Sequence, residues 1–437
     1  MIAGFGRARI QLPGELVYAR WLLEGAETWR ILLAAPLDDI TIIEVDSYMA
    51  APSAGAVLAD LGARVIKVEP FSGDPLRGLG RPAKISGPFE GYDFGFDVDN
   101  RGKQSIAVAL DTEEGAALVR RLVSRAEVFL CNLLPHRQAR FGLDPESLKA
   151  ANPRIIHATL TGYGTDGPDA LRPGYDVTAF FARSGLYDAM RGGDEGEVPQ
   201  ARPAQGDNTA GLALVAGILA ALRLAERTGE AQVIETSLFE TAVWTQSTDF
   251  GVVAVDKAPV RRRARHNQLG AEQNRYPCGD GKWVVINQLG RGSFERFCKA
   301  LGKEAWLEDD RFVDGKSRYR NMPDLVDEVD AVMKTKSRDE WGAIFDEVGL
   351  IWGPVQTLEE VADDLQAEAI GLFPTVAHAE RGEYRSVRIP MRIHGSDVGP
   401  QGPAPECGEH TAAILADAGL TENEIKALVA AGAIQGS

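Results

Sequence analysis

The chain has 437 residues, of which 44% are hydrophobic and 25% charged, and its formal net charge is −16. This length allows two or three domains, and the composition is that of an ordinary globular protein. An acidic surface disfavours nucleic acids and anionic membranes as partners, so an anionic ligand needs a local basic pocket.

Cysteine and histidine are too scattered to indicate a metal site or a disulfide framework. No CxxC, HxxxH or HExxH spacing occurs, and no apolar run has the form of a signal peptide or a membrane span. We therefore expect a cytoplasmic protein with reduced thiols and no metal. The four cysteines are Cys131, Cys278, Cys298 and Cys407.

The N-terminal residues 1–38 stand apart from the rest of the chain. Hydrophobic spacing over 16–33 predicts an amphipathic helix there, which ends before a proline. A β-branched run over 40–45, a helix of small residues over 53–61 and a strand over 64–68 then predict a βαβ unit. The core is thus expected to begin after residue 38.

Strand and helix patterns alternate up to about residue 250. Parallel strands joined by helices are covered on both faces, which explains their continuous apolar runs. We therefore predict a mostly parallel sheet covered by helices. The further strands are predicted over 105–110, 128–133, 154–161 and 232–236, and the helices over 112–125, 212–224 and 238–250.

The pattern changes after a basic stretch at 261–265. Asp280-Gly281 separates two short β-patterned runs and indicates a hairpin, and helical patterns follow. Residues from about 270 to 375 are therefore expected to form a separate α+β domain. Helices are predicted over 293–301, 324–334 and 338–348, a tail strand over 387–393, and tail helices from Gly408 and Glu422.

One acidic residue, Asp207, precedes the long apolar run 212–224. Such a run predicts a buried helix, and a carboxylate is seldom placed at its dry end without a partner or a function. Asn208 and Thr209 are suited to cap this helix, and its first N–H groups and dipole would favour an ionised Asp207. The feature fits an ordinary helix cap or a carboxylate nucleophile, and taken alone it favours the cap.

Residues 162–167 match GxGxxG directly after a predicted strand. A dinucleotide site needs a helix to open there, but Pro168, Asp169 and Pro173 follow instead. We interpret the motif as a glycine-rich loop of a site, which leaves a nicotinamide dehydrogenase as a remote alternative.

Two further groups of residues allow two interpretations each. Tyr175-Asp176 is either a buried hydrogen-bonded pair or part of a site. A set of basic residues in the first half forms either a pocket for a phosphorylated ligand or a solvated surface. This set comprises Lys67, Arg77, Arg81, Lys84, Arg101, Lys103, Arg137 and Arg140.

A series of short motifs runs in order from residue 51 to residue 232. It includes Leu58–Pro70 (LADLGARVIKVEP), Gly73–Arg77 (GDPLR), Asn100–Ser105 (NRGKQS), Asn132–Pro135 (NLLP), Arg172–Asp176 (RPGYD), Gly206-Asp207 and Glu226–Gln232 (ERTGEAQ). With these motifs the chain resembles the class III (family III) CoA-transferases, the family of formyl-CoA transferase and carnitine CoA-transferase.

The resemblance implies an α/β fold in which a large Rossmann-like domain with a parallel sheet carries a smaller α+β domain. It also implies an interlocked homodimer in which each subunit threads through the other. The expected divisions are an N-terminal extension (1–38), a large CoA-binding catalytic domain (39–260), a small α+β domain (261–380) and a C-terminal segment that returns to the large domain (381–437).

The resemblance further implies that Asp207 is the catalytic aspartate, with Tyr175 and Asp176 as further site residues. Coenzyme A, as acyl-CoA, is then a substrate, a carboxylic acid is the acceptor, and no prosthetic group is expected. The CoA-contacting positions of the family fall on or near Lys103, Asn132, Leu133 and Arg140, and charge alone suggests Arg77 and Arg137 in addition.

The implied reaction transfers CoA from an acyl-CoA donor to a carboxylic acid through an aspartyl-CoA thioester on Asp207. The α-methylacyl-CoA racemases share this fold, but they carry a histidine at the position of Tyr175. Tyrosine, with an ordinary pKa of about 10, is a poor base at neutral pH, so epimerisation with Asp207 as a base is the weaker alternative. A non-catalytic acyl-CoA-binding protein is a more remote one.

Overall fold

The computed structural model describes residues 35–79, 85–257 and 259–435, and in addition the backbone of 6–12, 15–21 and 32–33. The chain forms two compact units. The first combines 1–184, 201–247 and 371–437, and the second combines 185–200 with 248–370. The second unit thus starts before the predicted boundary at 261 and takes in 185–200, which sequence patterns had assigned to the large domain.

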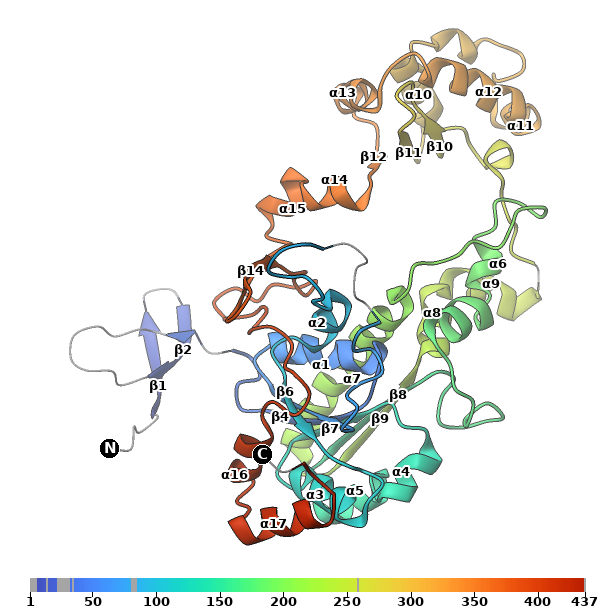
Figure 1. Cartoon of the computed structure of the whole chain (residues 1–437). Helices are drawn as coiled ribbons and strands as arrows, with labels where there is room; N and C mark the ends of the chain where they lie inside the picture. Colours follow the sequence, from blue (N-terminus) through green and yellow to red (C-terminus); the bar gives the residue numbers. More distant parts are fainter. Residues whose placement is uncertain are drawn as a thin grey trace. The chain divides into compact units, whose positions relative to one another are not determined.

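A six-stranded parallel sheet forms the centre of the first unit (Figure 1). Its order is β6-β5-β4-β7-β8-β9, so the direction of strand addition reverses between β4 and β7. Open α/β sheets bind ligands at the carboxyl ends of their strands beside such a reversal. The strands are β4 (Thr41–Val45), β5 (Arg64–Glu69), β6 (Gln104–Ala107), β7 (Val128–Cys131), β8 (Ile156–Thr161) and β9 (Gln232–Ser237), which confirms the strands and the parallel sheet predicted for this region.

Helices cover both faces of the sheet (Figure 1). The residues buried on the two faces differ, since one face is apolar and the other contains charges. On one face Ile43, Val45 and Phe129 pack with aliphatic residues of the covering helices in a dry core. The helices of this face are α3 (Glu113–Val123), α4 (Pro135–Phe141), α5 (Pro145–Ala151), α16 (Thr411–Asp417) and α17 (Glu422–Ala430). The other face is covered by α1 (Ala50–Asp60) and α7 (Gln205–Thr228) and contains buried charges.

These buried charges form the Lys67 cluster, which comprises Glu44, Asp46, Lys67, Asp74 and Lys103. The Lys67 Nζ lies 3.1, 2.9 and 3.1 Å from carboxylate oxygens of Glu44, Asp46 and Asp74, and the Lys103 Nζ lies 2.8 Å from Glu44. Burial and the charge of Glu44 raise the pKa of Asp46 well above its ordinary value. Inside the protein, two ammonium groups thus lie close to three carboxyl groups, and this pairing offsets the cost of burying them.

α1 and α7 approach each other closely because small residues line their contact. A Cβ added to Gly211 of α7 would lie 2.1 Å from the Ser53 Oγ and 3.0 Å from the Ala50 carbonyl oxygen. By length and mean hydropathy, 1.6 over 18 residues, α7 would suffice for a membrane span. It packs instead on α1, β8 and β9, although Leu219 and Leu224 on its outer side are exposed, so the helix is less buried than predicted.

The second unit has its own antiparallel sheet and its own apolar core. The predicted hairpin at Asp280-Gly281 is confirmed, as are the three predicted helices. The elements are β10 (Gln273–Pro277), β11 (Trp283–Asn287), β12 (Trp352–Val355), α6 (Leu186–Ala189), α10 (Ser293–Leu301), α11 (Gly315–Arg320), α12 (Met322–Met333), α13 (Arg338–Val348), α14 (Leu358–Ala362) and α15 (Leu365–Ala369).

Several further elements of the first unit lie outside the six-stranded sheet. They include α2 (Phe94–Asn100), the π-helical segment η1 (Asp176–Arg183), α8 (Leu238–Thr245), and the hairpin of β13 (Thr375–His378) and β14 (Gly382–Arg385). α9 (Ser247–Asp256) follows α8 and leads into the second unit, so the single predicted helix 238–250 is in fact two helices.

Two sequence predictions of secondary structure are wrong. The segment predicted as a helix over 16–33 instead contains β2 (Glu15–Trp21) and β3 (Leu32–Leu33), which form an antiparallel sheet with β1 (Gly6–Leu12). β2 contains Val, Tyr and Trp, which favour strands, and Pro-Gly separates it from β1 in the sequence, which is a turn signal.

The strand predicted over 387–393 is also absent. Pro390 lies in the middle of this run and has no N–H group to donate to a strand ladder. The chain instead forms the β13–β14 hairpin upstream, with Gly382 at φ +92°.

The contact between α1 and α7 leads to a stability prediction. Gly211→Ala places a methyl group against Ser53, so we expect the free energy of unfolding to fall by about 1–3 kcal/mol in urea titrations. Gly251→Ala in α9 is the matched control, because no atom lies within 4 Å of its added Cβ, and it should be neutral or slightly stabilising. Equal effects of the two changes would contradict the close packing.

Candidate active site

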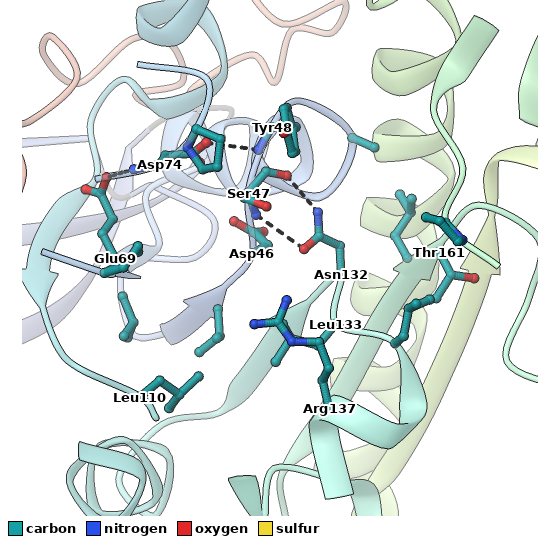
Figure 2. Close-up of a pocket in the computed structure, with 18 of the residues that line it drawn as sticks. Asp46, Ser47, Tyr48, Glu69, Asp74, Leu110, Asn132, Leu133, Arg137 and Thr161 are labelled. Carbon is teal, nitrogen blue, oxygen red and sulfur yellow. Dashed lines mark hydrogen bonds between the residues drawn. The ribbon is translucent and has the colours of Figure 1, made fainter. Parts of the chain in front are cut away.

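A cavity of about 660 Å³ lies in the first unit, at the carboxyl ends of β4 and β7 where the strand order reverses (Figure 2). One part of its wall is apolar and is formed by Val45, Val68, Val108, Leu110, Phe141 and Leu160. Polar groups lie on other parts of the wall, and they include Asp46, Ser47, Tyr48, Asp74, Asn132, Arg137, Tyr175 and Asp207. An apolar cavity with a few converging polar groups has the character of a small-molecule site.

Asp207 reaches this cavity from the first turn of α7. The helix begins at Gln205, earlier than predicted, because Ala204 adopts a left-handed conformation with φ +73° and turns the chain. The predicted capping by Asn208 and Thr209 is therefore wrong. Both residues lie inside the helix, where the Asn208 N–H donates to the Ala204 carbonyl and the Thr209 hydroxyl donates to the Gln205 carbonyl.

The electrostatic surroundings of Asp207 also differ from the prediction. Burial raises the pKa of Asp207 to about 7, and the neighbouring carboxyl of Asp176 adds to this effect. The pKa of Asp99, on α2, is likewise raised to about 7, chiefly by burial, and Asp207 contributes to that shift. Desolvation and like charges therefore outweigh the stabilisation expected from the helix dipole, and Asp207 is poised between its charged and neutral forms at neutral pH.

Asp176 is buried at the first residue of η1 and is tied to the start of α7. Its carboxyl accepts backbone hydrogen bonds from Val177, Ala204 and Gly206. Gly206 packs so closely that an added Cβ would lie 3.0 Å from the Asp176 Cβ. Asp176 thus holds the turn that precedes Asp207 and also supplies the negative charge beside it.

Tyr175 lines the cavity with a side chain that is 54% exposed, and its ring contacts a residue that sequence reasoning missed. This residue is Tyr48, which lies between β4 and α1. Their ring centroids are 5.4 Å apart at an interplanar angle of 82°. The sequence signal that could have indicated Tyr48 is an aromatic residue directly between a buried strand and a helix of small residues.

Three of the predicted CoA-contacting residues, Asn132, Leu133 and Arg137, line the cavity. The Asn132 side chain accepts from the Ser47 N–H at 3.3 Å and donates to the Ser47 carbonyl at 2.7 Å, which links the ends of β7 and β4 (Figure 2). Arg137 extends from α4 into the cavity (Figure 2).

The other three predicted contacts, Lys103, Arg77 and Arg140, are not among the lining residues. Lys103 is buried in the Lys67 cluster, where it also donates to the Pro52 carbonyl at 2.9 Å. The guanidinium of Arg77 binds Glu69 at 2.7 Å, and that of Arg140 lies 3.2 Å from Asp111 on the surface. Carboxylates of the acidic chain thus pair with these cations.

The wider basic pocket that the sequence suggested is absent from the described residues. Lys67 and Arg101 are also buried in ion pairs, the latter with Asp60 at 2.6 Å. Arg81 and Lys84 lie outside the described residues. Arg137 is the one cation among the described lining residues of the cavity.

The GxGxxG stretch at 162–167 forms a loop without a helix, as predicted. The next helical element is η1, which begins only at Asp176. Gly162 and Gly174 both line the cavity and lie back to back, since a Cβ on Gly162 would come within 2.8 Å of the Gly174 Cα. The glycines therefore permit a close crossing of two chain segments at the cavity wall.

Comparison with known proteins places these features in a family. A model described as CoA-transferase family III matches residues 37–411. The chain is 31% identical to the (R)-2-hydroxy-4-methylpentanoate CoA-transferase of Clostridioides difficile, over 89% of this chain and 97% of the relative. It is 33% identical to the succinate–glutarate CoA-transferase of Agrobacterium fabrum, over 87% of this chain and 95% of the relative.

A solved structure of a CaiB/BaiF family protein from Brucella suis is similar, with a TM-score of 0.78 and 32% identity. The similarity covers 88% of this chain and 100% of that protein. The family match begins only at residue 37, so almost all of the predicted N-terminal extension lies outside it. Matched along most of its length by sequence and by fold, the chain belongs to CoA-transferase family III.

Proposed function

We propose that the protein transfers CoA from an acyl-CoA donor to a carboxylic acid, with Asp207 as the covalent nucleophile. The observation that carries this proposal is the position of Asp207, a half-buried carboxyl on the wall of the cavity with a pKa near neutrality. A desolvated carboxylate that ionises close to working pH is more nucleophilic than one in water.

In the first half of the reaction, an oxygen of ionised Asp207 attacks the thioester carbonyl and the C–S bond breaks. A mixed anhydride and CoA thiolate result. The thiolate then attacks the aspartyl carbonyl of the anhydride, which releases the donor acid as a carboxylate and leaves an aspartyl-CoA thioester. The acceptor carboxylate repeats the two steps in reverse and regenerates Asp207, so the thioester energy is conserved throughout.

Each attack places negative charge on a carbonyl oxygen that needs hydrogen-bond donors. The Asn208 N–H, a donor suggested by the sequence, is taken up by the Ala204 carbonyl within α7. Tyr175 is the better candidate, because its exposed hydroxyl-bearing side chain lines the same cavity as Asp207. Arg137 is the lining cation suited to the CoA phosphates, beside Asn132 and Leu133.

The residues that line the cavity favour CoA transfer over epimerisation as the reaction of this protein. A racemase needs a second base opposite Asp207, and no histidine occurs among the described residues that line the cavity. His157 is buried on β8, where its Nε2 lies 3.0 Å from the Leu143 carbonyl oxygen.

We also propose that the protein is an interlocked homodimer. In the first unit, α7, β9 and α8 pack on one another and expose Leu224, Val233 and Trp244, the last with 77% of its surface accessible. Exposed apolar residues on neighbouring elements are typical of a protein interface. A second copy of this chain is the partner that the resemblance implies.

The nucleophile is tested by substitution and by trapping. Asp207→Ala should lower the rate of CoA transfer by at least about a thousandfold, because the covalent route is lost. During turnover of the wild type, hydroxylamine should form a hydroxamate at Asp207, seen by peptide mass spectrometry. Asp363→Ala is the control, because Asp363 lies exposed at the C-terminal end of α14, and this variant should retain full activity. Wild-type transfer by Asp207→Ala would refute Asp207 as the nucleophile. Absence of transfer by the wild type itself would return the protein to the acyl-CoA-binding or racemase alternatives.

The pH dependence follows from the raised pKa of Asp207. Protonated Asp207 cannot attack, so kcat/KM should rise with pH and reach half its maximum near pH 7. Asp176→Asn removes a charge that opposes ionisation, so the midpoint should move to lower pH. An unchanged midpoint, or one moved upward, would contradict the proposed coupling of the two carboxyls.

The proposed dimer is tested by substitution of the exposed Trp244. Trp244→Glu places a charge in the proposed interface, so light scattering after gel filtration should show a mass shift from dimer towards monomer. Val313→Glu, at an exposed position of the second unit, is the control and should leave the mass unchanged. A wild-type protein that is monomeric throughout would refute the proposal.

A further inference from the structure

An exposed ion pair lies at the edge of the cavity, between Asp111 and Arg140. Asp111 lines the cavity from the loop between β6 and α3, and Arg140 lies in the last turn of α4. The Arg140 Nη2 is 3.2 Å from the Asp111 Oδ1, and the side chains of Arg140 and Asp111 are 66% and 74% exposed. Because water screens such a pair, it contributes little to stability. It is therefore a contact that a more strongly charged ligand can break.

Asp111 differs in exposure from three other acidic residues that line the cavity. The side chains of Asp46, Glu69 and Asp74 are at most 1% exposed, and each is paired with a cation inside the protein. A ligand that enters the cavity therefore meets little of their charge. The carboxyl of Asp111 faces water instead, so of these four groups it is the one that an incoming anion approaches.

Arg140 belongs to the same short helix as Arg137, the cation that lines the cavity. The two positions are three residues apart, so both side chains project from one side of the helix. Their guanidinium carbons lie 5.9 Å (Arg137) and 5.3 Å (Arg140) from the centroid of the Phe141 ring, which itself lines the cavity. The Arg120 side chain fixes this end of α4, since it donates to the Phe141 carbonyl at 2.7 Å. Two guanidinium groups thus lie near one part of the cavity wall, and Asp111 binds the second.

The anionic groups of CoA are the phosphates of its nucleotide part, a diphosphate and a 3′-phosphate. A guanidinium group binds a phosphate through two parallel hydrogen bonds, and a phosphate with more than one negative charge attracts it more strongly than a carboxylate at the same distance. A phosphate at this edge of the cavity would therefore draw Arg140 away from Asp111. The Asp111 carboxylate would then remain as a like charge beside the ligand, and this charge opposes binding.

We infer that Asp111 sets the affinity for CoA: its carboxylate competes with the phosphates of CoA for Arg140, and CoA binding exchanges the Arg140–Asp111 ion pair for an Arg140–phosphate contact. This inference rests on the proposed CoA transfer, and it adds how the nucleotide part of the substrate is held. Because the loss of the ion pair and the remaining charge of Asp111 both oppose binding, acyl-CoA substrates and products bind less tightly and dissociate faster than they would without Asp111.

The experiment measures dissociation constants by isothermal titration calorimetry of the full-length protein at low ionic strength. The ligands are CoA and adenosine 3′,5′-bisphosphate, which represents its nucleotide part. Asp111→Asn keeps the shape of an exposed side chain and removes its charge, so we expect both ligands to bind about five- to tenfold more tightly, with a smaller gain at high salt. Arg140→Gln should weaken the binding of both ligands by about fivefold.

The double variant separates competition for Arg140 from simple repulsion of the ligand. If Asp111 acts by holding Arg140, Asp111→Asn should improve binding by no more than about twofold once Arg140 is already replaced by Gln. Equal gains with and without Arg140 would show that Asp111 only repels the ligand, and would overturn the inference. Glu422→Gln is the matched control, because it removes one charge from another exposed ion pair of the first unit, with Lys426, and should leave both constants unchanged.

Two further outcomes separate this inference from the proposed function. An Asp111→Asn variant that binds CoA as the wild type does, or more weakly, would overturn the inference and leave the proposed CoA transfer intact. A wild type that binds neither ligand and transfers no CoA to any acid would overturn both.

Discussion

The buried ion cluster around Lys67 is the interaction on which the cavity depends. It connects the ends of β4 and β5, and through Asp74 it holds the turn at Tyr48. Through Lys103 it reaches the Pro52 carbonyl in α1 and the Asn100 side chain at the end of α2. Five segments of the chain thus share one network, and removal of a single partner would leave an uncompensated charge in the interior.

The ion pairs of this cluster have a consequence for the cavity. The two lysines are held by the carboxyl groups of Glu44, Asp46 and Asp74. Neither lysine contributes a free positive charge to the cavity. Among the described residues that line the cavity, Arg137 is the one cation, and burial and the charge of Asp176 raise the pKa of Asp207.

The start of α7 both positions the carboxyl of Asp207 and sets its electrostatic surroundings. Asp176 binds the backbone of Ala204 and Gly206, which orients the first turn of the helix. Its charge also opposes ionisation of Asp207. A helix N-terminus by itself would favour the carboxylate, so the raised pKa reflects burial and a like charge acting against the dipole.

Much of the first unit could be predicted from the sequence. The strands between residues 40 and 236 have continuous apolar runs, and the helices between them have apolar periodicity, both of which depend only on neighbouring residues. The failures are local conflicts, such as Pro390 within a strand-like run. The start of α7 was misplaced because nothing about an alanine at position 204 signals a left-handed conformation.

The sequence by itself determined the parallel sheet, the hairpin of the second unit and, through its motifs, the family and Asp207 as the candidate nucleophile. Only the tertiary structure decided which cations remain free, since Lys103 and Arg77 meet carboxylates that are distant in the chain. It also decided the pKa of Asp207 and the pairing of Tyr48 with Tyr175. These properties depend on burial and on through-space distances, which residue spacing along a chain does not encode.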